Sequence, residues 1–166
     1  YDGMSTATPL AVIKSGGTVN AWDMLLGFIP GTIGETSVIA IVIGAVILIL
    51  TGVIDLKIPA SYIITFVLFL VLFADQGRDP YYITCQLCGG GLMLGAFFMA
   101  TDYVTSPITN TGKIIYGICL GIMTGILRVF SASAEGVSYA IIFCNLLVPL
   151  IENITLPKCF GKGGEN

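Results

Sequence analysis

The sequence predicts an all-α integral membrane protein with five transmembrane helices and one re-entrant segment. Three observations support this fold class: 55% of the 166 residues are hydrophobic, only 10% are charged, and the mean hydropathy is +0.95. A soluble domain carries about 25% charged residues. The few charges also leave long uncharged runs, and a helix needs about 20 such residues to cross a bilayer.

Five runs of residues are candidate spans. Asp55 and Lys57 end the first run, and Pro59 suits the first turn of the helix that follows. The fourth run has only 14 residues, or roughly 21 Å of helix. It therefore spans only if Lys113 and Arg128 extend their charged groups to the membrane surface. The runs cover residues 36–54, 58–74, 81–101, 114–127 and 136–151.

Two shorter apolar patches lie within residues 10–30, before the first span. Each has about eleven residues, too few to cross a bilayer, and Lys14 and Asp23 interrupt them. We therefore predict a re-entrant or interfacial half-helix, whose backbone groups must be satisfied by protein or a cavity. The chain then divides into residues 1–35 with this element, residues 36–154 as the five-helix bundle, and residues 155–166 as a polar C-terminal tail.

A second polar interruption, residues 101–112, is weakly similar to the start of the chain. Residues 99–102 and 105–107 read Met-Ala-Thr-Asp and Thr-Ser-Pro, beside Met-Ser-Thr-Ala-Thr-Pro at residues 4–9. Alternating crossings place the two segments on opposite faces, as in inverted-repeat membrane proteins whose ligand sites use broken helices. We therefore expect the chain to form one half of an inverted-repeat bundle, within a longer protein.

Composition also excludes several classes of function. The net charge is −3 and no basic cluster occurs, which excludes a nucleic-acid partner. The chain has no histidine, so we expect neither histidine-dependent triads nor zinc sites, and we predict no metal site. Cys85 and Cys88 supply at most half of an iron–sulfur site, and packing beside the neighbouring glycines explains them adequately.

The distribution of lysine and arginine predicts an orientation. With alternating crossings, four of these residues fall on one face and three on the face of the N-terminal segment. The face with more positive charge is cytoplasmic, so the N-terminal segment lies outside. The first set is Lys57, Lys113, Lys158 and Lys162, and the second set is Lys14, Arg78 and Arg128.

The run Ser5-Thr6-Ala7-Thr8-Pro9 has two interpretations. One is a helix N-cap followed by proline near the first helical position. In the other, the Thr8 hydroxyl, left accessible by the small Ala7, is a covalent attachment point for a phosphate-bearing group. Amides at a helix N-terminus favour such an anion.

With this motif, residues 27–37, 99–107 and 128–136 resemble the family formed by the D-type subunit of the Rnf complex and the B-type subunit of the sodium-translocating NADH:quinone oxidoreductase. The resemblance covers most of the chain and is to a C-terminal half. In that family a flavin transferase links FMN through its phosphate to the last Thr of the motif. The resemblance thus implies covalent FMN on Thr8, with Ser5, Thr6 and Ala7 completing the motif.

The resemblance also implies a fold and a setting. Family members look like urea transporters, and the complex is an ion-translocating ferredoxin:NAD oxidoreductase, to which this chain would contribute electron transfer without being catalytically complete. The implied partners are other membrane subunits, among them a second flavin subunit and iron–sulfur subunits. The implied location is the inner (plasma) membrane, with the flavin on the extracytoplasmic side. The alternative is a channel or secondary transporter without a redox role, which broken segments alone would support equally well.

Further candidate residues each have two interpretations. Gly31, Gly34, Glu35 and Thr36 form either a capped helix start or part of the flavin site. Arg128 either pairs with Glu135 at the surface or steadies the flavin. Asp102 is either an interfacial cap or part of an ion path, since ionisable groups in membrane spans are costly.

Overall fold

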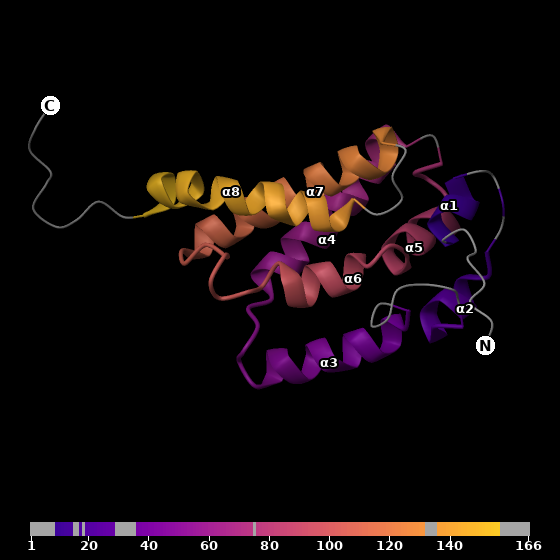
Figure 1. Cartoon of the computed structure of the whole chain (residues 1–166), viewed down its shortest axis with the longest axis horizontal. Helices are drawn as coiled ribbons and strands as arrows, with labels where there is room; N and C mark the ends of the chain where they lie inside the picture. Colours follow the sequence, from indigo (N-terminus) through magenta and orange to yellow (C-terminus); the bar gives the residue numbers. More distant parts are fainter. Residues whose placement is uncertain are drawn as a thin grey trace, which may run out of the picture.

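The computed structural model describes residues 9–14, 17, 19–28, 36–74, 76–131 and 136–156, and the regular structure in this part of the chain is helical (Figure 1). The elements are α1 (Pro9–Lys14), α2 (Ala21–Leu26), α3 (Val38–Leu50), α4 (Lys57–Phe73), α5 (Pro80–Cys88), α6 (Leu92–Leu94), the π-helix η1 (Gly95–Met99), α7 (Asn110–Phe130) and α8 (Val137–Thr155). This confirms the predicted all-helical class.

The helices α7 and α8 are each long and apolar enough to cross a membrane. The α5 helix and the α6–η1 segment meet the same test as a pair, bent by 63°. The α3 and α4 helices are apolar but shorter, with 13 and 17 residues. Every predicted run is therefore helical, as expected of a multi-pass membrane protein, while five complete crossings stay a prediction.

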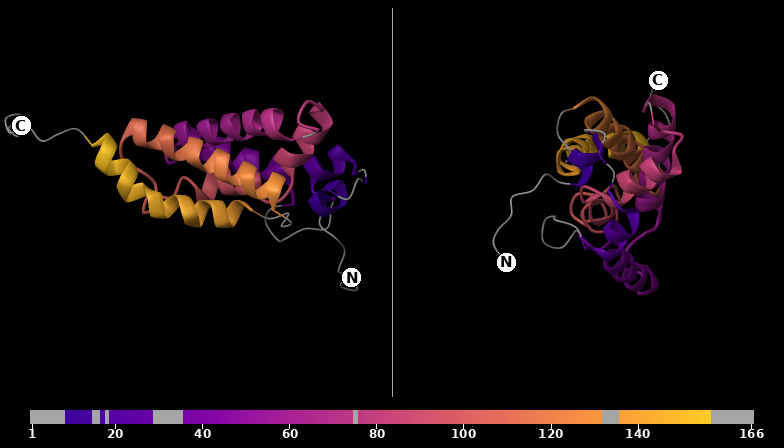
Figure 2. Two further views of the ribbon diagram at one scale, coloured as in Figure 1. Left: turned by 90° about the horizontal axis from the view of Figure 1, so that it is seen from above. Right: turned by 90° about the vertical axis from the view of Figure 1, so that its right-hand side faces the viewer.

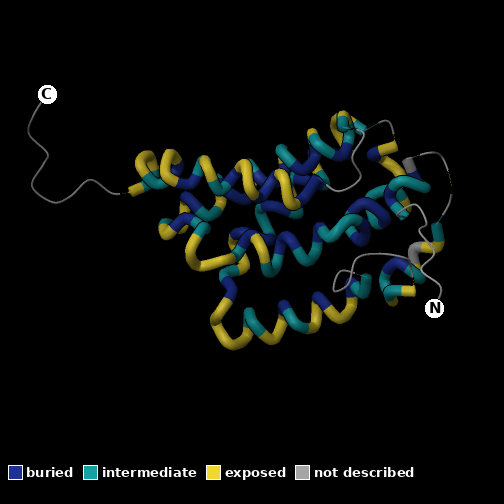
Figure 3. The backbone as a smooth tube through the Cα atoms, viewed as in Figure 1, coloured by how far each residue is buried: buried dark blue, intermediate teal, exposed yellow. Residues whose placement is uncertain are grey.

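The longer helices α3, α4, α7 and α8 run side by side along the long axis of the molecule (Figures 1 and 2). The core lies between α4, α7, α8 and the α6–η1 segment, and α3 lies at the edge with most of its outer side exposed (Figures 2 and 3). The short helices α1 and α2 lie at one end, and the connections at residues 51–56 and 101–109 lie at the other. The α1 and α2 helices have six residues each, which fits the predicted half-helix. A re-entrant path for this element stays a prediction.

The α4 and α7 helices approach closely because glycines of α7 face α4. A Cβ atom added at Gly117 would lie 1.9 Å from Ser61 Oγ, and one at Gly121 would lie 2.7 Å from Thr65 Cβ. Small residues at such positions let two helix backbones come together inside a membrane. The buried side chains of Tyr62, Phe66, Leu70, Tyr116 and Leu120 then fill the surrounding core.

The third predicted span is a broken helix. The α5 helix ends at Cys88, and Gly90 and Gly91 both have φ of 63°, a left-handed conformation that glycine adopts readily. The chain resumes as α6 at Leu92 in a new direction. This break lies outside the two interruptions that the sequence analysis expected, at residues 10–30 and 101–112.

The fourth predicted span has 21 residues as α7, longer than expected. Its first turn is polar and begins at the N-cap Thr109, whose Oγ1 accepts a hydrogen bond from Gly112 N at 3.1 Å. The expectation that Arg128 reaches the membrane surface is wrong, because its side chain is only 4% exposed. The helix therefore carries a buried cation near its C-terminal end.

Candidate functional site

The predicted flavin site lies mostly outside the described residues. Of the candidate residues for the flavin site, Thr36 and Arg128 are described, and so is Asp102, the candidate for an ion path. Pro9, the residue after Thr8, begins α1. The assignments of Ser5, Thr6, Ala7, Thr8, Gly31, Gly34 and Glu35 stay predictions.

The helices that follow Thr8 pack against the broken third span. A cluster of buried side chains joins α1, α2, the start of α3 and α5. A Cβ atom at Gly89 would lie 2.0 Å from Leu10 Cδ1 and 3.1 Å from Met24 Cε, so both side chains lie directly on this glycine. The buried members of the cluster are Ile13, Met24, Val38, Cys85 and Cys88.

A second contact joins the same two regions. The hydroxyl of Tyr81, in the first turn of α5, donates a hydrogen bond to the carbonyl of Val19 and accepts one from its N–H at 3.0 Å. Val19 lies between α1 and α2. The α5 helix thus holds the N-terminal helices at both of its ends.

Arg128 binds the carbonyl groups at the break. Its Nη1 donates to the carbonyl oxygen of Gln86 and, at 3.3 Å, to Gln86 Oε1. Its Nη2 donates to the carbonyl oxygens of Gly89 at 2.8 Å and Gly90 at 3.1 Å. The guanidinium carbon lies 5.3 Å from the centre of the Phe66 ring. A cation is favoured here because the last carbonyls of a helix carry partial negative charge.

These contacts bear on the two roles proposed for Arg128. Its side chain is buried, and the groups described above bind its guanidinium from within the bundle. Glu135 lies outside the described residues, and the contact of Arg128 with a flavin stays a prediction.

Thr36 lies at the start of α3. The next residue, Ser37, is the N-cap, and its Oγ accepts a hydrogen bond from Ala40 N at 3.4 Å. This confirms a capped helix start at the predicted position. Thr36 also lines a cavity of about 410 Å³ between α3 and the α6–η1 segment, together with Ser37, Ala40, Ile41, Leu94 and Phe98.

Asp102 is exposed and belongs to the connection between η1 and α7. This connection lies at the opposite end of the bundle from α1 and α2 (Figure 1). Its Oδ2 accepts a weak hydrogen bond from Thr105 Oγ1 at 3.4 Å, and its carbonyl accepts one from Ser106 N at 3.0 Å. These contacts close the turn at residues 102–106, and the role of Asp102 as an interfacial cap stays a prediction. A part of Asp102 in an ion path stays a prediction.

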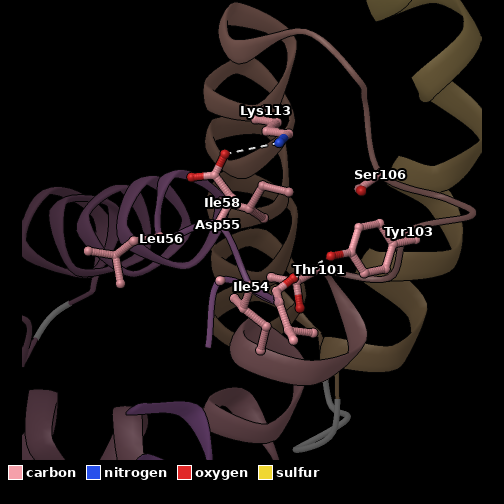
Figure 4. A pocket seen from close by; sticks show the side chains of 10 residues that line it. Ile54, Asp55, Leu56, Ile58, Thr101, Tyr103, Ser106 and Lys113 are labelled. Atoms are coloured by element: carbon pink, nitrogen blue, oxygen red, sulfur yellow. Dashed lines mark hydrogen bonds and ion pairs between the residues drawn. The ribbon is translucent and has the colours of Figure 1, made fainter. Parts of the chain in front are cut away.

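A polar cavity of about 410 Å³ lies at this end, between residues 52–58 and 101–106 (Figure 4). Lys113 Nζ lies 2.9 Å from Asp55 Oδ2, and Lys57 Nζ lies 3.6 Å from the same atom. The hydrogen bond from Lys113 holds the pKa of Asp55 below its usual value. The Tyr103 hydroxyl donates to the carbonyl of Val53 at 2.8 Å across the cavity.

From the sequence, Asp55 and Lys113 are expected only to mark the ends of two spans, and their ion pair is not predicted. The available signal was their opposite charge on a shared face of the membrane. Among the described residues, no group of three or more Cys, Asp or Glu side chains is placed to hold a metal ion.

A bundle of apolar helices with a helix broken inside it defines a multi-pass membrane protein, with its N-terminal helices attached at the break. The chain belongs to the NQR2, RnfD, RnfE family, which it matches over residues 1–161. The family resemblance expected from the sequence is thereby confirmed.

Relatives in this family are named as subunits of ion-translocating oxidoreductases. The chain is 42% identical to the D-type subunit of the Na⁺-translocating ferredoxin:NAD⁺ oxidoreductase complex of Acetobacterium woodii, covering 96% of this chain and 50% of that protein. It is 37% identical to the D-type subunit of the proton-translocating complex of Clostridium ljungdahlii, covering 96% and 52%. It is also 37% identical to the B-type subunit of the Na⁺-translocating NADH-quinone reductase of Chromohalobacter salexigens, covering 92% and 40%. The chain thus spans about half the length of the relatives it matches.

Proposed function

We propose that this chain is part of the electron-transferring membrane subunit of an ion-translocating ferredoxin:NAD oxidoreductase complex, and that Thr8 carries FMN through a phosphoester bond. The relatives named as D-type subunits of such complexes support the setting. The sequence Ser5-Thr6-Ala7-Thr8, directly before α1, is the observation that carries the attachment. Other subunits of the complex, including a second flavin subunit and iron–sulfur subunits, supply the remaining electron carriers.

The chemistry of the residues suits this cofactor. A threonine hydroxyl can act as the nucleophile that forms a phosphoester, losing its proton as the phosphoryl donor releases its leaving group. Bound flavin supplies one- and two-electron transfer, and the protein around it holds it and tunes its potential. The packing of α1 on α5 supports the proposal because it holds the helix that follows Thr8 against the bundle.

The competing function is a channel or transporter of similar fold without a redox role. Broken helices in such proteins use the carbonyls at the break to bind the transported cation. Here the guanidinium of Arg128 binds these carbonyls, which disfavours a free cation at this position. We therefore favour electron transfer as the function.

Denaturing gel electrophoresis with in-gel flavin fluorescence tests the attachment, since only a covalent flavin survives denaturation. The complex is produced with its flavin transferase as wild type, Thr8→Ala and Thr6→Ala. We expect the fluorescent band of this subunit in the wild type and in Thr6→Ala, and its loss in Thr8→Ala. Fluorescence retained in Thr8→Ala rejects the assigned residue, and a dark wild-type band rejects the flavin function.

We also propose that Thr8 lies on the extracytoplasmic side of the inner membrane. The count of four positive residues against three supports this orientation. In intact cells, a cysteine introduced at Ser15 should react with a membrane-impermeant maleimide and one at Gly161 should not. The opposite labelling pattern would reverse the topology.

A further inference from the structure

The break in the third span leaves backbone carbonyls inside an apolar bundle. The last four carbonyls of an α-helix have no partner within the helix, and unsatisfied backbone groups are costly inside a membrane. Gly89 N bonds to the carbonyl of Cys85 at 2.9 Å, and the carbonyls of Gln86, Gly89 and Gly90 converge on Arg128. The shape of this break therefore depends on a side chain from α7.

The contact needs a guanidinium group. Its planar fork directs Nη1 to one carbonyl and Nη2 to two others, while its central carbon lies over the ring of Phe66. Lysine carries a point charge on a flexible stem and cannot reproduce this arrangement. Because Gly89, Gly90 and Gly91 have no side chains, they contribute little else that would hold the turn.

The same turn packs against α1, the helix that follows Thr8. The carbonyl of Gly89 accepts a hydrogen bond from Arg128, and the α-carbon of Gly89 packs so tightly on Leu10 that an added Cβ would lie 2.0 Å from it. Leu10 is itself only 5% exposed and lies two residues after Thr8. A short path of contacts therefore runs from Arg128 through Gly89 to Leu10.

We propose that Arg128 is a positioning residue for the N-terminal segment that carries Thr8, acting through the break in the third span. The guanidinium fixes the turn at Gly89, and the turn fixes α1. The role of this segment as the flavin carrier rests on the proposed function, whereas the coupling of Arg128 to α1 does not. Arg128 reaches α1 from 118 positions further along the chain, as counted from Leu10.

Hydrogen–deuterium exchange of the purified complex tests this coupling without using the flavin. We expect Arg128→Gln to speed exchange of the amides of α1 and of residues 86–91 about tenfold or more, because hydrogen bonds to a charged group are among the stronger ones. Exchange in α8 should keep its wild-type rate. Arg128→Lys should give an intermediate result, and Arg78→Gln, which removes a positive charge from an exposed turn, should change neither region.

Leu10→Ala and chemical rescue complete the experiment. Leu10→Ala should speed exchange in α1 and leave residues 86–91 unchanged, because Leu10 lies at the far end of the path. In Arg128→Ala, guanidinium ion at low millimolar concentration should restore protection to both regions. Wild-type exchange of α1 in Arg128→Gln overturns the proposal, and so does an equal rise across α7 and α8, which indicates general unfolding.

Flavin fluorescence anisotropy in the native complex separates this proposal from the proposed function. If Thr8 carries FMN, the anisotropy should fall in Arg128→Gln while the in-gel flavin content per subunit stays at the wild-type level. A wild-type complex without covalent flavin rejects the proposed function, and the exchange data then still decide whether Arg128 positions α1. Unchanged anisotropy in a flavin-bearing complex overturns the positioning of the flavin.

Discussion

The hydroxyl oxygens of Tyr62 and Thr124 lie 2.6 Å apart, and both side chains are fully buried between α4 and α7. This hydrogen bond joins two helices inside the apolar core, where water is excluded. Hydrogen bonds between helices in membranes contribute about 0.6 kcal/mol on average and up to about 1.7 kcal/mol.

A double-mutant cycle measures this contact. Tyr62→Phe and Thr124→Val should each lower the free energy of unfolding in detergent micelles, and the double variant should cost less than the sum of the two. We expect a coupling energy of about 0.6 to 1.7 kcal/mol, since each single change removes the same bond. Additive losses would show that the two hydroxyls do not stabilise each other.

The close approach of α4 and α7 predicts the effect of enlarging its glycines. Gly117→Ala places a Cβ 1.9 Å from Ser61 Oγ and 2.9 Å from the Ile58 carbonyl oxygen. Such overpacking typically costs about 1–3 kcal/mol, so the thermal unfolding midpoint should fall. The control is Gly44→Ala in α3, whose Cβ would meet only Phe98 Cζ at 3.3 Å and which gains helix propensity. An equal fall in both variants would contradict the close packing of α4 on α7.

The ion pair of Asp55 with Lys113 predicts a pH dependence. The pKa of Asp55 is lowered in the folded state, so this carboxyl group releases its proton more readily in the folded protein than in the unfolded chain. The stabilisation is then complete above the unfolded-state pKa of about 3.9, and it disappears as the pH falls through the lower folded-state pKa.

The test compares the wild type with Lys113→Gln across pH. The variant should be less stable at neutral pH, by under about 1 kcal/mol because the pair is partly exposed. The difference should stay constant down to about pH 5 and shrink below about pH 4. A difference that grows as the pH falls would contradict a lowered pKa of Asp55.

Asp102→Asn separates the two roles of this carboxylate. Because Asp102 lies in an exposed turn with Thr105 as a weak partner, we expect a change in unfolding free energy within about 0.5 kcal/mol and unchanged flavin content. Vesicles containing the variant complex should keep the wild-type ratio of ions pumped to electrons transferred, as fits a carboxylate that only stabilises a turn. A lower ratio at constant flavin content would instead place Asp102 in the ion path.

Charge placement was enough to predict the helical regions. Each uncharged run became a helix or, for residues 81–101, a broken helix, because burying charge in a bilayer is costly. The break itself was missed because Gly89, Gly90 and Gly91 were interpreted as a packing surface. Their composition allows a turn, but the left-handed backbone at Gly90 and Gly91 arises in the folded bundle.

The contacts of Arg128 were also beyond sequence reasoning. A charge near the end of an apolar run normally extends to the membrane surface. Its carbonyl partners lie 38 to 42 positions earlier in the chain, and only the break turns them toward α7. The pairing of Asp55 with Lys113 similarly depends on α4 packing beside α7, which no local pattern encodes.

The length of α3 has a consequence for the surrounding lipid. Its 13 residues make about 20 Å of helix, whereas the hydrocarbon core of a bilayer is about 30 Å thick. The 21 residues of α7 match that thickness almost fully. If α3 crosses the bilayer and faces lipid, thinning of the bilayer is one way to accommodate it, and we then predict acyl chains compressed by about a third on the α3 side and an ordinary thickness beside α7.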